Sequence, residues 1–220
     1  MNAPLVGPSG GQGPQSPPSS AATAATAALA MIAGIGRSLD VALQAVTGGA
    51  SRRRSADRQL LEEFILPTFS LDRSIKRVLF CGCARYTQAY EGLFPHSEYW
   101  TLDPSPRRQR FGSKLHIVDR LEALNHHAIA SFDLIICNGV LGWGIDDHEQ
   151  AEAAIRSSHA ALASHGRLVL GWNDVAPRNR IRPEHIAALA AFTPAPLSRF
   201  GARVRVPGWH RHVFDFYRKA

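Results

Sequence analysis

The stretch RVLFCGCARYTQAY, residues 77–90, decides how this sequence folds. A basic residue opens it, a short apolar run follows, and Gly82 ends that run. Such a pattern is typical of a buried parallel strand that leads into a tight turn. A dinucleotide-binding loop would place further glycines near Ala84 and Tyr86. The stretch therefore predicts either a cofactor loop with altered chemistry or a strand end that only resembles one.

The sequence after residue 75 alternates between strand-like and helix-like segments. The expected strands are residues 77–81, 99–102, 115–118, 132–137 and 167–172. The expected helical segments lie near 87–94, 105–111, 120–129 and 147–163, the last one capped by Gly166. Strands that alternate with helices favour right-handed crossovers and a parallel sheet covered by helices on both faces.

The C-terminal residues break this alternation. In RVRVPGWHRHVFDFYRK, residues 203–219, two alternating runs flank Pro207 and Gly208. This pattern predicts an antiparallel β-hairpin that closes the sheet. The expected fold class is therefore α/β and Rossmann-like, with five parallel strands and a C-terminal antiparallel hairpin.

The N-terminal part has a different composition. Residues 1–27 are rich in Pro, Gly, Ser, Gln and Ala, which predicts a disordered low-complexity tail. Residues 28–47 carry an apolar stripe at helical spacing, which predicts a helix that docks on a partner, mediates self-association, contacts a membrane surface loosely or simply lies on the main domain. We expect residues 28–72 to form a helical extension and linker, with a short helix around residues 60–65 that Pro67 stops. The main domain is then residues 73–220.

Charge and hydropathy exclude several classes of function. The net charge is +7, and the basic runs at 52–54 and 106–110 could contact phosphates, but without a nucleic-acid-binding module a solvated surface is the favoured interpretation. No apolar run reaches the roughly 18 residues that a membrane span needs. All three cysteines lie in apolar runs, which suits a cytoplasmic protein without disulfides. Cys81 and Cys83 have no second cysteine pair at zinc-site spacing, so no metal is expected.

Residues 75–219 resemble the class I S-adenosylmethionine-dependent methyltransferase domain, because five landmarks occur in that family's order. VLFCGCARYT takes the place of the glycine-bearing loop after the first strand, and YWTLDPSP supplies the acidic Asp103 after the second, 21 positions beyond Gly82. HIVDRL supplies Asp119 after the third strand. FDLIICNGVLGWG and GRLVLGWND look like the fourth and fifth strands.

The resemblance implies S-adenosyl-L-methionine as cofactor and a set of residues that bind it. Asp103 would bind the ribose hydroxyls and Asp119 would lie near the adenine. Arg85 could pair with the cofactor's carboxylate, and Tyr86 could close over the cofactor. The full expected set is Gly82, Cys83, Ala84, Arg85, Tyr86, Asp103, Pro104, Asp119, Arg120, Asn138, Gly139 and Val140.

The methyl acceptor is expected to be a small molecule that the sequence does not identify. Trp143, Asn173 and His210 are candidates for the substrate pocket because they follow strand ends or lie in the C-terminal hairpin. No catalytic residue stands out. The general-base candidates, none at a decisive spacing, are Asp146, Asp147, His148, Asn173, His210 and His212.

Two other functions compete with the methyltransferase. A non-catalytic methyltransferase-like module would keep the sheet for protein binding, and the altered loop after Gly82 favours it. The retained Asp103, Asp119 and Asn138 argue against it. A nicotinamide-dependent oxidoreductase is a third possibility, but the terminal hairpin and the missing second glycine argue against that function.

Overall fold

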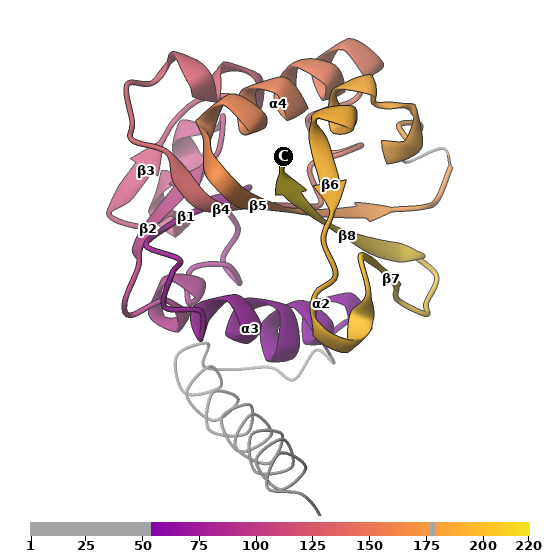
Figure 1. Ribbon diagram of the computed structural model, residues 1–220, viewed down its shortest axis with the longest axis horizontal. Helices are drawn as coiled ribbons and strands as arrows, with labels where there is room; N and C mark the ends of the chain where they lie inside the picture. The colour runs from indigo at the N-terminus through magenta and orange to yellow at the C-terminus, as the bar shows by residue number, and fades with distance from the viewer. Residues whose placement is uncertain (1–53, 177–178) are drawn as a thin grey trace, which may run out of the picture. The chain divides into compact units, whose positions relative to one another are not determined.

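The computed structural model describes residues 54–176 and 179–220. The predicted tail at 1–27 and the predicted helix and self-association segment at 28–47 lie outside the described residues. Figure 1 shows a central sheet with helices on both faces. The strands are β1 (Arg77–Cys81), β2 (Glu98–Leu102), β3 (Leu115–Ile117), β4 (Phe132–Asn138), β5 (Leu162–Asn173), β6 (Phe192–Pro194), β7 (Arg203–Arg205) and β8 (His212–Lys219).

The sheet has the strand order β3-β2-β1-β4-β5-β8-β6, and β7 also pairs with β8. The first five strands are parallel to their neighbours, as the sequence predicts. β1 lies between β2 and β4, with Cys81 paired to Leu102 on one side and to Cys137 on the other. Because both faces of β1 are covered, its residues after Arg77 are all apolar and buried, without alternation.

β8 closes the sheet as an antiparallel strand. One edge of β8 pairs with β5 over seven residue pairs. The other edge is shared, because β7 pairs with residues 213–215 and β6 pairs with residues 217–219. The β7–β8 pairing confirms the hairpin predicted around Pro207 and Gly208.

The helix α4 (His148–Ala161) covers one face of the sheet (Figure 1). Asp147 caps it by accepting a hydrogen bond from the backbone N–H of Gln150 at 2.8 Å. The predicted cap at Gly166 is wrong. α4 ends at Ala161 because Leu162 is already extended and pairs with Phe132, which places Gly166 inside β5.

Other connections between strands contain 3-10 helices. They are η2 (Tyr90–Leu93), η3 (Pro106–Phe111), η4 (Leu121–His126), η5 (Pro183–His185), η6 (Ala187–Ala191) and η7 (Ser198–Phe200). The helices η2, η3 and η4 fall where the sequence predicts helical segments, whereas η5, η6 and η7 were not predicted. In η2 and η4 the buried residues stand three positions apart, Tyr90 with Leu93 and Leu121 with Leu124. This spacing puts both side chains on one face of a 3-10 helix, which has three residues per turn.

The opposite face is covered by a continuous helical segment made of α2 (Ala56–Leu60), η1 (Leu61–Ile65) and α3 (Leu66–Ser70). The predicted stop at Pro67 is wrong, since the helix continues to Ser70. A proline inside a helix has no N–H to donate, and its ring crowds the preceding turn. Here the preceding turn is the wider π-helical turn of η1, so the helix continues past Pro67. Leu61, Ile65 and Phe69 are buried, so this segment contributes to the core of the domain.

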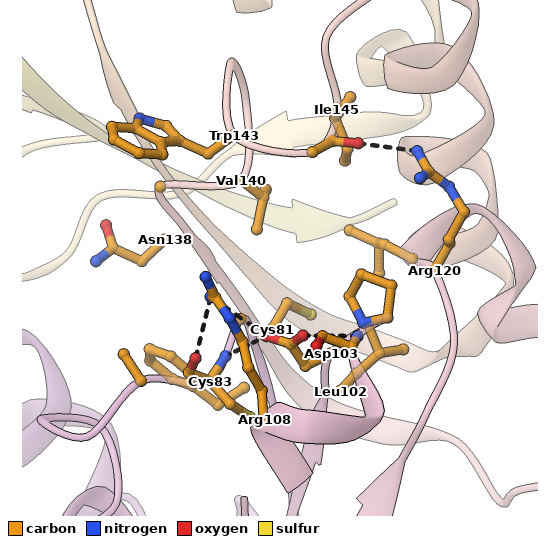
Figure 2. A pocket seen from close by; sticks show the side chains of 18 of the residues that line it. Cys81, Cys83, Leu102, Asp103, Arg108, Arg120, Asn138, Val140, Trp143 and Ile145 are labelled. Atoms are coloured by element: carbon orange, nitrogen blue, oxygen red, sulfur yellow. Dashed lines mark hydrogen bonds and ion pairs between the residues drawn. The ribbon is translucent and has the colours of Figure 1, made fainter. Parts of the chain in front are cut away.

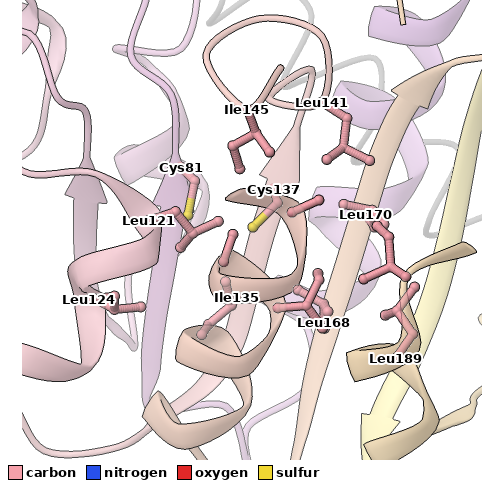
Figure 3. Close-up of a cluster of buried hydrophobic side chains, with 14 of the residues drawn as sticks. Cys81, Leu121, Leu124, Ile135, Cys137, Leu141, Ile145, Leu168, Leu170 and Leu189 are labelled. Carbon is pink, nitrogen blue, oxygen red and sulfur yellow. The ribbon is translucent and has the colours of Figure 1, made fainter. Parts of the chain in front are cut away.

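The larger apolar cluster lies between α4 and the sheet. Figure 3 shows Ile135, Cys137, Leu168 and Leu170 on the sheet facing the helix. Within the described residues, no helix has the length and hydropathy that crossing a membrane requires.

Candidate functional site

A pocket of about 700 Å³ opens at the carboxyl ends of the central strands. Its walls come from the segments at the carboxyl ends of β1 to β5, together with the start of β8 and of α2. β1 lies between β2 and β4. Strands β2 and β3 are therefore added on one side of β1, and β4 and β5 on the other, which makes β1 the switch point of the sheet. Open α/β sheets bind their ligands in the crevice at such a switch point.

The turn after β1 forms one wall of the pocket. Gly82 has a φ of +90°, which a residue with a side chain adopts only under strain. The N–H of Gly82 donates to the carbonyl oxygen of Leu102 at 2.8 Å, which ties the end of β1 to the end of β2. The glycine therefore shapes the backbone that borders the pocket.

Asp103 links this turn to the end of β2. Its carboxylate is 3% exposed and accepts from the backbone N–H of Cys83 at 2.8 Å and from that of Ser105 at 2.9 Å. A carboxylate has about four acceptor positions. Asp103 lines the pocket, so a ligand with paired hydroxyl donors can use the positions that the backbone leaves open (Figure 2).

Arg108 completes the same cluster, although its basic run at 106–110 predicts a solvated surface. Its Nη1 donates to the carbonyl oxygen of Cys83 at 3.1 Å and lies 3.7 Å from the Asp103 carboxylate (Figure 2). The only signal in the sequence was its place five positions beyond Asp103, in the segment that begins at Pro106.

The thiol of Cys83, in the same turn, is neutral. Burial raises its pKa to about 11, so this sulfur stays protonated at pH 7.

The structure brings most of the predicted site residues together. Those that line the pocket are Gly82, Cys83, Ala84, Tyr86, Asp103, Pro104, Arg120, Asn138, Gly139, Val140, Trp143, Asn173 and His210. Arg85 and Asp119 of the predicted cofactor-binding set do not line it, and neither do the general-base candidates Asp146, Asp147 and His148. Arg85 is exposed. The carboxylate of Asp119 accepts from the Arg120 backbone and lies 2.9 Å from Nε2 of His127, whose hydrogen bond lowers the pKa of Asp119.

The helical segment before β1 reaches the pocket, which the sequence did not indicate. Ser55 and Asp57, at the start of α2, are among the lining residues. The guanidinium of Arg58 lies 3.9 Å from the centre of the Tyr86 ring, a cation–π contact between α2 and the turn after β1. The entrance near Tyr86 is therefore held by a segment distant in sequence.

The loop after β4 forms the wall opposite Asp103. Gly139, Gly142 and Gly144 all have positive φ, which allows the chain to turn back so that Leu141 and Ile145 form a bridge. Arg120 donates to the carbonyl oxygen of Gly144 at 2.8 Å. Trp143 at the tip of the loop is 57% exposed and borders the pocket, as Figure 2 shows.

A buried histidine connects the ends of β4, β5 and β8. Nε2 of His212 lies 3.0 Å from the amide oxygen of Asn138, and Nδ1 lies 2.7 Å from that of Asn173. Burial lowers the pKa of His212 to about 4, so the ring is neutral at pH 7. Gly171 makes room for the network, since a Cβ there would lie 2.1 Å from the Asn138 oxygen. Because both ring nitrogens already face the asparagines, His212 is poorly placed to act as a free general base.

The cysteines and metal-ligating residues give no second centre in the described part of the chain. Cys81, Cys83 and Cys137 are buried and free. No group of three or more His, Cys, Asp or Glu residues among residues 54–176 and 179–220 is placed to hold a metal ion.

Known structures share this fold. No model of a protein family and no curated protein matches the sequence. The N-methyltransferase NodS from Bradyrhizobium japonicum WM9, crystallised with S-adenosyl-L-homocysteine, superposes with a TM-score of 0.57 at 20% identity, over 81% of this chain and 96% of NodS. A TehB-like S-adenosylmethionine-dependent methyltransferase from Corynebacterium glutamicum gives a TM-score of 0.54 at 15% identity, over 87% and 99% of the two chains.

A third structure is the 1,6-didemethyltoxoflavin-N1-methyltransferase from Burkholderia thailandensis, with 1,6-didemethyltoxoflavin and S-adenosylhomocysteine bound. It gives a TM-score of 0.51 at 18% identity, over 95% of this chain and 93% of that enzyme. Together with the strand order and the antiparallel β8, these similarities show that the chain has the class I methyltransferase fold. The fold predicted from the sequence is confirmed.

Proposed function

We propose that this protein is an S-adenosylmethionine-dependent methyltransferase that acts on a small-molecule acceptor. One observation carries the proposal. The Asp103 carboxylate is hydrogen-bonded to the turn after Gly82, and both line the pocket at the carboxyl ends of the strands. A buried carboxylate with open acceptor positions suits a ligand that presents two neighbouring hydroxyl groups, as the ribose of the cofactor does.

The lining residues divide into two sets under this proposal. The turn around Gly82, Asp103 and Arg108 holds the ribose and the amino-acid end of the cofactor. Leu121 and the segment near Arg120 border the adenine side, while Asp119 is occupied by His127. The loop after β4, with Asn138 and Trp143, faces the acceptor.

When bound, S-adenosylmethionine supplies a methyl group activated by the positive sulfur. The residues around Gly82 and Asp103 would hold the cofactor, and the methyl group would pass to a lone pair of the acceptor while the electron pair of the carbon–sulfur bond stayed on the sulfur. The chain's task is then to align the acceptor and exclude water. Trp143 and Tyr86 border the entrance and serve this purpose. The neutral His212 orients Asn138 and Asn173, and the acceptor's proton leaves to solvent.

Two features support a small-molecule acceptor. The pocket is of the size that small ligands occupy in proteins. Of the similar structures, one is named as an N-methyltransferase and another was crystallised with the small molecule 1,6-didemethyltoxoflavin. A cytoplasmic location is part of the same proposal, and the three free, buried thiols suit a reducing compartment. Self-association through residues 28–47 stays a prediction.

Calorimetric titration of the purified protein with S-adenosylmethionine, S-adenosylhomocysteine and NAD tests the proposal. We expect saturable binding of the first two and none of NAD. Binding of NAD alone would indicate an oxidoreductase, and binding of none of the three would indicate a non-catalytic module.

A further inference from the structure

The contacts of His212 determine which hydrogen-bonding groups the pocket can present to the methyl acceptor. Asn138, Asn173 and His212 all line the pocket, at the ends of β4 and β5 and at the start of β8. His212 itself is 4% exposed and packs against Phe214, with ring centres 4.6 Å apart. The ring is therefore held between two amides and an aromatic side chain.

A neutral imidazole has one N–H donor and one lone-pair acceptor. The two asparagines that flank the ring must then act in opposite ways. One turns its amide oxygen to the ring's N–H, and the other turns its NH2 group to the ring's lone pair. Oxygen and nitrogen of an asparagine amide exchange by a half-turn of the side chain, and hydrogen bonding decides between the two orientations.

Each asparagine has a second polar atom that the histidine does not use. Among the described residues, no hydrogen bond involves the amide nitrogen of either Asn138 or Asn173, and neither nitrogen is a buried atom without a partner. Each amide therefore has a polar end left for a partner in the pocket that both residues line. After one asparagine has reversed, the wall presents one oxygen acceptor and one NH2 donor, separated by about the width of the ring.

We infer that this wall binds the methyl acceptor, and that the acceptor is an uncharged ring compound with a hydrogen-bond donor and a hydrogen-bond acceptor on opposite edges. The inference rests on the proposed function and names its substrate class. An anionic group is disfavoured there because the donor and the acceptor are both neutral. The clearance at Gly171 is consistent with a built network, since any side chain there would displace Asn138.

The first test measures the protonation state of the His212 ring and needs no ligand. Long-range ¹H–¹⁵N NMR spectra of the labelled protein at pH 7 should show the His212 ring with a single protonated nitrogen, and His212→Gln identifies its signals. A doubly protonated ring would overturn the inference, because both asparagine oxygens would then face the ring and the pocket would receive only NH2 groups.

The second test uses 4-pyridone, whose N–H and carbonyl lie at opposite ends of a six-membered ring. Ligand-observed NMR should show that it binds with and without S-adenosylhomocysteine, and that 1-methyl-4-pyridone, which lacks the donor, binds about tenfold more weakly. Asn138→Leu and Asn173→Leu should each weaken 4-pyridone binding about tenfold. Asn125→Leu is the matched control, because Asn125 is bonded to Ser157 outside the pocket.

The two proposals fail in different ways. If S-adenosylhomocysteine binds but 4-pyridone does not, or if 4-pyridone binds the Asn138 and Asn173 variants as well as the control, the acceptor inference is wrong and the proposed function stands. If 4-pyridone binds as expected but S-adenosylhomocysteine does not, the wall is confirmed as a polar site and the methyltransferase assignment fails.

Discussion

Two arginines near the pocket have very different surroundings. Arg108 lines the pocket and holds the Cys83 carbonyl, whereas Arg85, which the sequence suggested for the cofactor's carboxylate, is exposed and does not line it. We therefore expect Arg108→Ala to weaken S-adenosylhomocysteine binding about fivefold or more, because the turn loses a charged hydrogen bond. Arg85→Ala is the matched control and should stay within about twofold. Calorimetric titration measures the affinity of both variants. A larger loss of affinity in Arg85→Ala would mean that Arg85 binds the cofactor's carboxylate, as the sequence suggested.

His212 makes stability depend on pH. Its pKa is about 4 in the folded protein, below the ordinary value of 6.5, because the charged ring would be buried. Asp57 raises this pKa and His210 lowers it further. As the pH falls from 6.5 toward 4, the unfolded chain takes up the proton first, so the folded state loses stability in that window. The contribution is fully present above pH 6.5.

His212→Gln removes this titration and keeps a polar side chain. Between pH 7 and pH 5 the wild type should lose about 2 kcal/mol more free energy of unfolding than the variant. Urea denaturation at the two pH values measures the difference. Equal losses in the two proteins would show that His212 takes up its proton as easily in the folded state as in the unfolded chain.

At the scale of the strand, Gly171 in β5 is the position where space is most restricted. A Cβ there would overlap Asn138 at 2.1 Å and approach His212 at 3.0 Å. Gly171→Ala should therefore lower the free energy of unfolding by about 1–3 kcal/mol. Gly92→Ala is the control, since a Cβ at this exposed position of η2 meets nothing within 4 Å, and we expect a change within about 0.5 kcal/mol.

Urea midpoints of the two glycine variants give the comparison. If Gly171→Ala is as stable as Gly92→Ala, then Asn138 moves aside without cost and the network around His212 is not tightly held.

The strands were predictable from sequence because burial on both faces leaves a local signal. The predicted strand at residues 77–81 coincides with β1, and the predicted hairpin matches β7 and β8. The helical segments were harder, because a few buried residues at a spacing of three do not distinguish a short 3-10 helix from an α-helix. Pro67 shows the same limit, since a π-helical turn upstream lets the helix continue past it.

The residues that line the pocket also differ in how well the sequence predicts them. Gly82, Asp103 and Asn138 line the pocket, and the sequence pointed to them because they directly follow predicted strands, whose carboxyl ends meet at one edge of a parallel sheet. Arg108 and the role of His212 were missed, because they depend on contacts between segments far apart in the chain. Asn138 and His212 are separated by 74 positions, and no local pattern connects them.

For the molecule as a whole, residues 1–27 should be dispensable. Their composition offers no apolar core. A protein that starts at residue 28 should melt at the same temperature as the full chain and bind S-adenosylhomocysteine equally well. Differential scanning calorimetry and titration check this, and a drop of several degrees would show that the segment packs on the rest.

The central claim is that Asp103 binds the ribose of S-adenosylmethionine. Asp103→Ala is a poor test, because it leaves the backbone N–H groups of Cys83 and Ser105 without their acceptor. Asp103→Asn keeps the size and removes the charge, and its amide oxygen still accepts from one of the two backbone N–H groups, so it disturbs the turn less than Asp103→Ala does.

The decisive measurement is calorimetric titration of wild type and Asp103→Asn with S-adenosylhomocysteine, with melting temperatures recorded for both. Hydrogen bonds to a charged group contribute about 1.5–3 kcal/mol, so we predict that the variant binds about tenfold or more weakly while it remains folded. Equal affinity of the two folded proteins would contradict the account.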